Sequence, residues 1–192
     1  MAKRLLVIVL VLGLKMFAQN EARWEYRQND ALQGKTFDEL ILEGTYIKPP
    51  SSGTSETPRI LVRCENKKFR RGYLLIGGVA EHTGGWEGHT ARSFKGKPQA
   101  QVDIRWDEKR TAVSEFWELS DDRRSLLFDK QQLVKLMTGR SLGDPTDPQA
   151  LLPMLYLGVV EAGANQIVMR FNMPGDPKQV VTLCGLQHVM RE

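Results

Sequence analysis

From residue 58 onward, the sequence repeats one pattern, in which short runs of β-favouring residues alternate with residues that favour turns. The clearest run is 101–107, where Val102, Ile104 and Trp106 alternate with charged side chains. Strict alternation is typical of a strand with one buried face. The other expected strands are 60–64, 73–79, 112–119, 125–128, 155–161, 166–173 and 178–184. This pattern predicts a mainly β fold, either a single-domain antiparallel β-sandwich or a partly closed barrel.

Three connections refine this prediction. Segment 37–47 fits one strand, bulged or regular, interrupted at Gly44 and Thr45. The charged segment 65–68 predicts a hairpin loop longer than the tight two-residue kind. Segment 48–58 is rich in proline and serine, which indicates an exposed loop. It is not expected to be a domain boundary, because the roughly 30 residues before it could not hold a core alone.

One short amphipathic helix is expected after residue 129. Asp129 can cap it, and Gln132, three residues later, can complete a capping box. Gly139 can close the last turn. The apolar stripe that would cover the sheet consists of Leu133, Val134, Leu136 and Met137.

The N-terminus has the layout of a secretory signal peptide. A basic start at Lys3 and Arg4 precedes the apolar run 5–14 and then a polar stretch. The run is shorter than the roughly 20 residues that a membrane span needs. We expect residues 1–18 to be removed after Ala18, leaving 19–192 as one β-rich domain. Cleavage after Ala22 and retention as an anchor stay open.

The charge balance argues against nucleic-acid binding. Without residues 1–18, which carry three bases and no acid, 24 basic side chains face 23 acidic ones. Proteins that hold nucleic acid through its phosphates need a concentrated basic surface. Only the segment 67–71 is densely basic, so no nucleic-acid partner is expected.

The two cysteines agree with export. Cys64 and Cys184 each end a β-like run, and a pair of this kind commonly forms a disulfide in an oxidising compartment. The alternative is two independent buried thiols. Neither cysteine lies in a CxxC motif or beside a histidine. Metal and nucleophile roles are therefore not expected for either.

The most unusual segment is 77–90, which holds five glycines and two of the three histidines. A glycine-rich loop with an aromatic residue and titratable groups is a plausible binding surface. The candidate binding residues are His82, Trp86, Glu87 and His89. The alternative is a solvated connection. The seven-residue histidine spacing matches no standard metal site, so no metal or other cofactor is predicted.

Several acidic residues raise the alternative of a hydrolase. Glu115 and Glu118 flank two aromatic residues on one expected strand, with Asp103, Asp107 and Glu108 on its expected neighbour. Glycosidases need two carboxyl groups that converge on one bond. Residues three apart on a strand point to opposite faces, so Glu115 and Glu118 fit this requirement poorly. Asp103 and Asp107 are expected to form a solvated row balanced by Arg105.

The order of elements resembles a known family. It is similar in plan to the TagO or VasI group of periplasmic accessory proteins of type VI secretion. The resemblance rests on Trp24, Pro58, Cys64, Arg105, Asp107, Trp117, Ser120, Asp121, Phe171, Gly185 and Leu186. Segments 77–90 and 67–71 depart from the plan. The resemblance implies a non-catalytic envelope protein that contacts other proteins, and it transfers no catalytic residue.

These observations support two functional hypotheses. The first is an exported, periplasmic or secreted, non-catalytic protein that contacts an envelope or secreted protein or the cell wall. The alternative is a small envelope hydrolase that acts on a polysaccharide or peptidoglycan-type substrate through Glu115, Glu118 or Asp107. The sequence predicts no oligomeric state.

Overall fold

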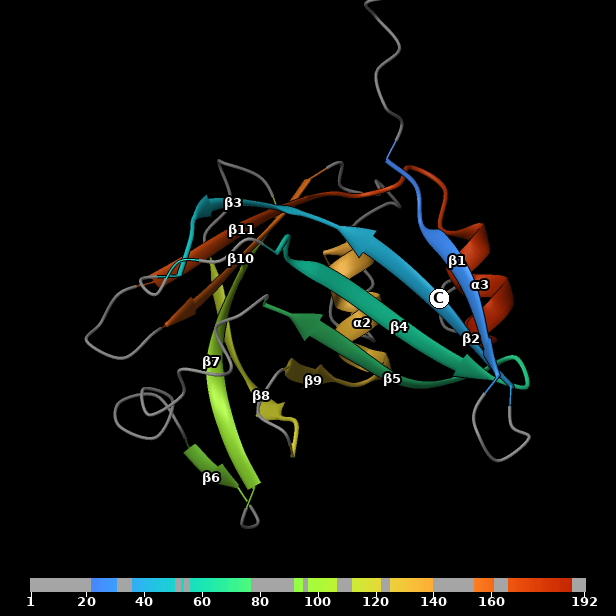
Figure 1. The fold of residues 1–192 in the computed structure, drawn as a ribbon, viewed down its shortest axis with the longest axis horizontal. Helices are drawn as coiled ribbons and strands as arrows, with labels where there is room; N and C mark the ends of the chain where they lie inside the picture. The colour runs from blue at the N-terminus through green and yellow to red at the C-terminus, as the bar shows by residue number, and fades with distance from the viewer. Residues whose placement is uncertain are drawn as a thin grey trace, which may run out of the picture.

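The computed structural model describes residues 22–30, 36–50, 53, 56–76, 92–94, 97–106, 112–121, 125–139, 154–160 and 166–187. Within these ranges, eleven strands form one antiparallel sheet and two helices pack against it (Figure 1). The strands are β1 Glu25–Asp30, β2 Thr36–Glu43, β3 Thr45–Lys48, β4 Arg59–Glu65, β5 Lys68–Leu75, β6 Arg92–Phe94, β7 Lys97–Arg105, β8 Val113–Leu119, β9 Ser125–Phe128, β10 Met154–Val160 and β11 Gln166–Asn172. The helices are α2 Lys130–Thr138 and α3 Lys178–Cys184. The mainly β, antiparallel fold is confirmed.

The strand order shows that the sheet curls back on itself. The order is β1-β2-β4-β5-β9-β8-β7-β10-β11-β3, with β6 paired to β7 outside this path. β2 lies near one end of this order and β3 at the other, yet only Gly44 separates them along the chain. The two ends of the sheet must therefore nearly meet. Among the described residues the ladder itself does not close, so the fold is a partly closed barrel.

Gly44 is the corner that permits this return. A Cβ atom at this position would lie 2.6 Å from the Phe171 ring and 2.9 Å from the Arg170 carbonyl oxygen. The Gly44 amide donates a 2.8 Å hydrogen bond to the Pro58 carbonyl. β2 pairs with β4 before the corner, and β3 pairs with β11 after it. The interruption predicted at Gly44 and Thr45 is therefore real, and its cause is close packing.

The inner face of the curled sheet forms the core. Alternation along the strands directs apolar side chains inward, and the largest fully buried ones include Trp117 and Phe171. The Phe128 ring lies over Gly72, whose Cβ would come within 1.9 Å of it. Trp117 packs against Phe128 with ring centroids 5.2 Å apart. Trp106, Trp117 and Phe171 are buried in the core, whereas Phe116 is exposed on the outer face.

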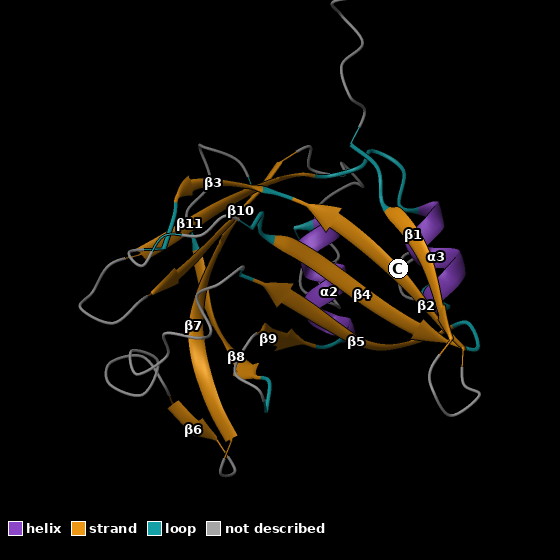
Figure 2. Cartoon of the chain, in the orientation of Figure 1, coloured by secondary structure: helices purple, strands orange, loops and turns teal. Residues whose placement is uncertain are grey.

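Helix α2 matches its prediction. Asp129 caps the helix, Gln132 completes the capping box, and Gly139 ends it in the left-handed conformation. All four predicted stripe residues are buried. The Trp106 indole donates to the carbonyls of Lys135 and Leu136 at 3.1 and 3.2 Å. This contact fixes the end of α2 to β7, and Figure 2 shows both helices against the sheet.

Three local predictions were wrong or incomplete. Lys178–Cys184 is a helix, not a strand, because Val180 and Cys184 share one buried helical face. The 65–68 loop is a tight turn, since Asn66 and Lys67 both have positive φ and form the two-residue connection that suits a hairpin. Strands β1 and β6 were not expected, because their sequences lack clear alternation.

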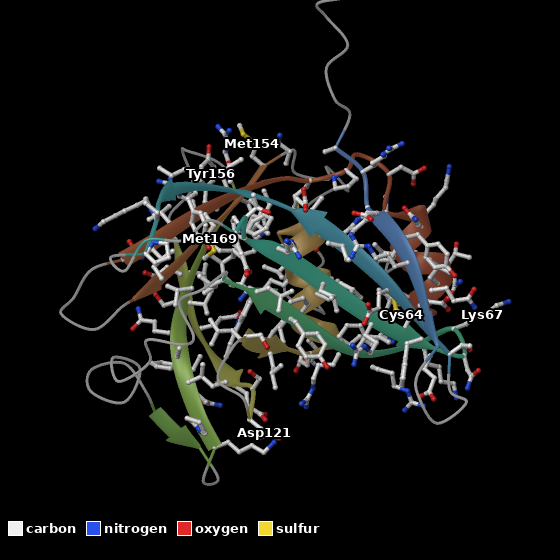
Figure 3. All side chains as sticks on the ribbon, in the orientation of Figure 1. Cys64, Lys67, Asp121, Met154, Tyr156 and Met169 are labelled. Carbon is white, nitrogen blue, oxygen red and sulfur yellow. A yellow bond between two sulfur atoms is a disulfide. The ribbon has the colours of Figure 1, made fainter. Side chains whose placement is uncertain are left out.

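The predicted Cys64–Cys184 disulfide is present. It joins β4 to α3 with a Cα–Cα distance of 5.2 Å, and both cysteines are buried. Figure 3 places Cys64 and Lys67 at the same end of the β4–β5 hairpin. Gly185 follows α3 with φ 63°, and a Cβ there would lie 2.2 Å from the Lys67 carbonyl oxygen. The disulfide and this contact hold α3 against the hairpin turn.

Other predictions fall partly or wholly outside the described ranges. In segment 48–58, the described part between β3 and β4 holds no helix and no strand beyond Lys48. Pro50 and Pro58 are buried there. The expected signal peptide, residues 1–18, lies outside the described residues. Neither α2 nor α3 has the length and apolar character to cross a membrane.

Replacing both cysteines by alanine should lower the free energy of unfolding. The disulfide closes a loop between residues 120 positions apart, which contributes about 4 to 5 kcal/mol in the chain-entropy model. Chemical denaturation of the Cys64→Ala/Cys184→Ala variant measures the loss. Non-reducing peptide mapping of the wild-type protein provides the control. Two free thiols in the exported protein, or unchanged stability in the variant, would contradict the prediction.

Gly44→Ala should destabilise the fold by about 2 kcal/mol, because the added methyl group would overlap the Phe171 ring and a backbone oxygen. Gly175→Ala is the matched control, since a Cβ there meets nothing within 4 Å. Thermal denaturation should separate the two variants clearly. Equal melting temperatures would mean that Gly44 is not a packing corner.

Candidate functional site

The four candidate binding residues in the glycine-rich loop lie outside the described residues. His82, Trp86, Glu87 and His89 all fall within 77–91. The described chain stops at Ile76, directly after β5, and resumes at Arg92 in β6. These residues therefore connect the end of β5 to β6.

The candidate hydrolase carboxylates are not brought together. Glu115 lies on the side of β8 that faces α2, where it pairs with Lys135 and accepts a 3.2 Å hydrogen bond from the Trp117 indole. Glu118 lies on the opposite face, as predicted, and pairs with Lys97 at 2.6 Å. Each carboxylate forms an ion pair that joins β8 to another element: Glu115 to α2 and Glu118 to β7. Asp107 and Glu108 lie outside the described residues.

Asp103 is the centre of a polar cluster on the outer face. It accepts hydrogen bonds from Ser114 at 2.6 Å, Gln101 at 3.0 Å and Gln166 at 2.7 Å. Gln166 reaches it by crossing over Gly158, which pairs with Asp103 in the sheet. These bonds tie β7, β8 and β11 together. Arg105, expected to balance Asp103, stacks on the Tyr156 ring at 4.8 Å.

A different surface, on the outside of β2, β4, β5 and β9, has the composition of a contact site. Its defining feature is an apolar row that runs straight across the four strands. Cross-strand pairing aligns Ile41 with Leu61, Leu61 with Tyr73, and Tyr73 with Leu127. We call this surface the β4–β5 outer face. Ile41 and Leu127, at the ends of the row, are buried, whereas Leu61 and Tyr73 between them are half-buried and keep part of their apolar surface accessible. An exterior sheet face is usually polar when it meets water, so apolar side chains are unusual there.

Arg63 lies at the centre of this face. Its guanidinium is 5.2 Å from the Phe37 ring centroid and 5.5 Å from that of Tyr73. It also donates two hydrogen bonds to Glu39, at 2.9 and 2.6 Å. Glu39 is only 6% exposed, whereas the Arg63 side chain is 37% exposed. The arginine is therefore held in one orientation while part of it stays accessible.

A bulge beside Arg63 concentrates positive charge on the same face. The register shifts between Arg63 and Cys64, so Arg63 pairs with Arg71 and Cys64 with Phe69. Arg70 is left over on the bulged strand and pairs with Glu65. Arg71 is exposed and has no ion-pair partner among the residues that the structure describes.

Strand β1 forms the border of the face. Arg27 donates to Glu25 at 2.8 Å, and this hydrogen bond lowers the pKa of Glu25 below its ordinary value. Tyr26 donates to Asp38 at 2.8 Å, and that bond raises the pKa of the Tyr26 hydroxyl. Both side chains of the Glu25–Arg27 pair are more than half exposed. Glu25 therefore stays ionised to a lower pH than a free glutamate.

Sequence reasoning missed the β4–β5 outer face, although one signal was available. In the run 59–65, Leu61 stands on the face that otherwise carries Arg59 and Arg63. A single apolar residue on the polar face of a strand is common, and it gains meaning only when pairing aligns it with apolar residues of neighbouring strands. Within the described ranges, no group of three or more histidine, cysteine or acidic side chains could hold a metal ion.

Comparisons of the chain with protein-family models, curated proteins and solved structures find no match.

A double-mutant cycle should show that Glu39 and Arg63 interact more strongly than an exposed pair. We expect a coupling energy of about 1 kcal/mol between Glu39→Ala and Arg63→Ala, because Glu39 is buried and accepts two hydrogen bonds. The control pair, Glu25 with Arg27, should couple more weakly, because both side chains are exposed and water screens their charges. Urea denaturation of the two sets of variants gives both values. Equal coupling energies would show that Arg63 is not held in place by Glu39.

Proposed function

We propose that this chain is an exported, non-catalytic protein of the periplasm or cell exterior that works by binding another envelope or secreted protein. The Cys64–Cys184 disulfide supports the compartment, because such bonds persist in oxidising environments. The resemblance to the TagO or VasI group supports an accessory role in secretion. Contact with the cell wall in place of a protein is the competing proposal.

The observation that carries the proposal is the fixed arginine that lies beside half-buried apolar side chains on an exterior face. Protein interfaces are enriched in aromatic residues and arginine. Phe37, Arg63 and Tyr73 provide these residue types in one stacked cluster, beside the apolar row. Binding orders side chains at a free-energy cost, and Arg63 is already ordered by Glu39 and the two rings. A partner that binds the β4–β5 outer face would therefore face a smaller cost of ordering Arg63.

The glycine-rich loop extends this proposal. Its chain leaves β5 just after Ile76, and β5 also carries Tyr73. We include His82, Trp86, Glu87 and His89 as further binding residues on this basis. Their chemistry suits hydrogen bonding and aromatic contact with a protein partner.

The hydrolase alternative has less support. Glycosidases of both stereochemical classes place two carboxyl groups on either side of one bond. Glu115 and Glu118 lie on opposite faces of β8, and each has a lysine partner. A catalytic pair would have to combine one of them with an acid such as Asp107.

Photo-crosslinking in the host cell should test the binding face. Benzoylphenylalanine at Tyr73 is expected to give a discrete protein adduct in the envelope fraction, because this ring borders the apolar row. The same probe at Arg170, exposed on β11, is the control and should not give that adduct. Arg63→Glu should reduce the Tyr73 adduct by about tenfold, because it reverses the central charge.

Three outcomes would contradict the proposal. One is the absence of any adduct from position 73, and a second is an adduct with cell-wall material only. The third is turnover of a wall polysaccharide by the purified protein that is lost in Glu115→Gln or Glu118→Gln. That result would establish the hydrolase instead.

A further inference from the structure

We infer that the partner bound by the β4–β5 outer face presents an extended segment in which apolar and acidic side chains alternate. This inference rests on the proposed function and specifies the chemistry of the partner. Three features of the face support the inference: its charges, the spacing between its charged and apolar rows, and the glutamates that limit which anions the face accepts.

The charged side chains on this face form a row with more cations than anions. Cross-strand pairing aligns Arg27 with Glu39, Glu39 with Arg63, and Arg63 with Arg71. Three cations and one anion thus form a line across β1, β2, β4 and β5. Arg27 has its own partner in Glu25, but Arg71 has none among the described residues. Like charges directly opposite each other on neighbouring strands are destabilising. The row therefore carries excess positive charge at Arg63 and Arg71, which a carboxylate from a partner would neutralise.

The charged row and the apolar row lie a fixed distance apart on β4 and β5. Leu61 and Arg63 are two residues apart on β4, and Tyr73 and Arg71 are two residues apart on β5. Side chains on one face of a strand repeat at roughly 6.6 to 6.8 Å. An extended segment lying along β4 and β5 has the same repeat. A partner with an acidic residue two positions from an apolar one can therefore contact both rows at once.

The glutamates on this face favour a peptide over a polyanion as the partner. Glu39, Glu43 and Glu65 share the face with the arginines and pair with Arg63, Arg59 and Arg70 respectively. A continuous chain of phosphates would meet these carboxylates as well as the cations. Single carboxylates at defined positions avoid that repulsion. The half-buried side chains of Leu61 and Tyr73 also offer a polyanion nothing, whereas the apolar side chains of a peptide can pack against them.

Synthetic peptides test this inference directly. The probe is a fluorescent peptide of alternating valine and glutamate, with a valine–lysine peptide and a serine–glutamate peptide as matched controls. We expect the valine–glutamate peptide to bind at least about tenfold more tightly than either control. Raising the salt concentration should weaken its binding, because the arginines are partly exposed. Fluorescence anisotropy measures each affinity.

Variants locate the binding site. Arg71→Glu should weaken binding of the valine–glutamate peptide by about tenfold, since it replaces a cation that has no partner among the described residues by an anion. Arg170→Glu, an exposed arginine on β11, is the control and should change the affinity less than about twofold. Circular dichroism melts establish that both variants fold. An equal loss in the two variants would indicate a general charge effect and overturn the inference.

The outcomes distinguish this inference from the proposed function. If position 73 gives its protein adduct but the valine–glutamate peptide binds no better than the lysine peptide, the face binds proteins and the acidic partner is wrong. If single-stranded DNA or anionic vesicles bind more tightly than the peptide and lose affinity in Arg71→Glu, the partner is a polyanion and the inference is also wrong. If neither the adduct nor peptide binding is found, both ideas fail.

Discussion

The packing at Gly44 is the constraint on which the rest of the fold depends. One continuous segment pairs with β4 before this residue and with β11 after it, so the first and last parts of the sheet are covalently tied together. The absence of a side chain lets Phe171 and the Arg170 backbone approach the corner. Curling the sheet in this way encloses its apolar inner face without a second sheet. The two helices then cover what the curl leaves open: α2 through its four buried stripe residues, and α3 through Val180 and Cys184.

The inner face of the sheet is enclosed and apolar, whereas the composition of the outer face differs between its two sides. On the β7, β8, β10 and β11 side, Asp103 joins strands through hydrogen bonds with Ser114 and Gln166, and the Phe116 ring is exposed. On the β2, β4, β5 and β9 side, an apolar row lies beside a line of arginines. The first surface satisfies its own hydrogen bonds. The second carries the half-buried side chains of Leu61 and Tyr73 beside Arg71, an exposed cation with no ion-pair partner among the described residues, and this combination is why the binding proposal is placed there.

The sequence predicted those features that a few neighbouring residues determine. Alternation in 101–107 correctly indicated that Val102, Ile104 and Trp106 face the core. The capping box at Asp129 and Gln132 correctly located α2, because a cap is a contact between residues three apart. The run 178–184 was misread because valines favour strands, while the decisive contact, Cys184 with Cys64, joins residues far apart in sequence. The β4–β5 outer face was missed for a similar reason. Its apolar row exists only once Ile41, Leu61, Tyr73 and Leu127 are aligned by pairing between four strands.

The disulfide connects the compartment of the protein to its proposed binding face. Cys64 directly follows Arg63, and the bulge at this point places Arg71 opposite Arg63. The same end of the hairpin is held by α3, through Cys184 and through the contact between Gly185 and the Lys67 carbonyl. In an oxidising environment these covalent and packing contacts act together on the strands that carry both arginines. The geometry of the face therefore depends on a bond that is rare in a reducing cytosol. The proposed export and the proposed binding thus depend on one structural feature, because an oxidising compartment would permit the disulfide that holds the strands of the proposed site.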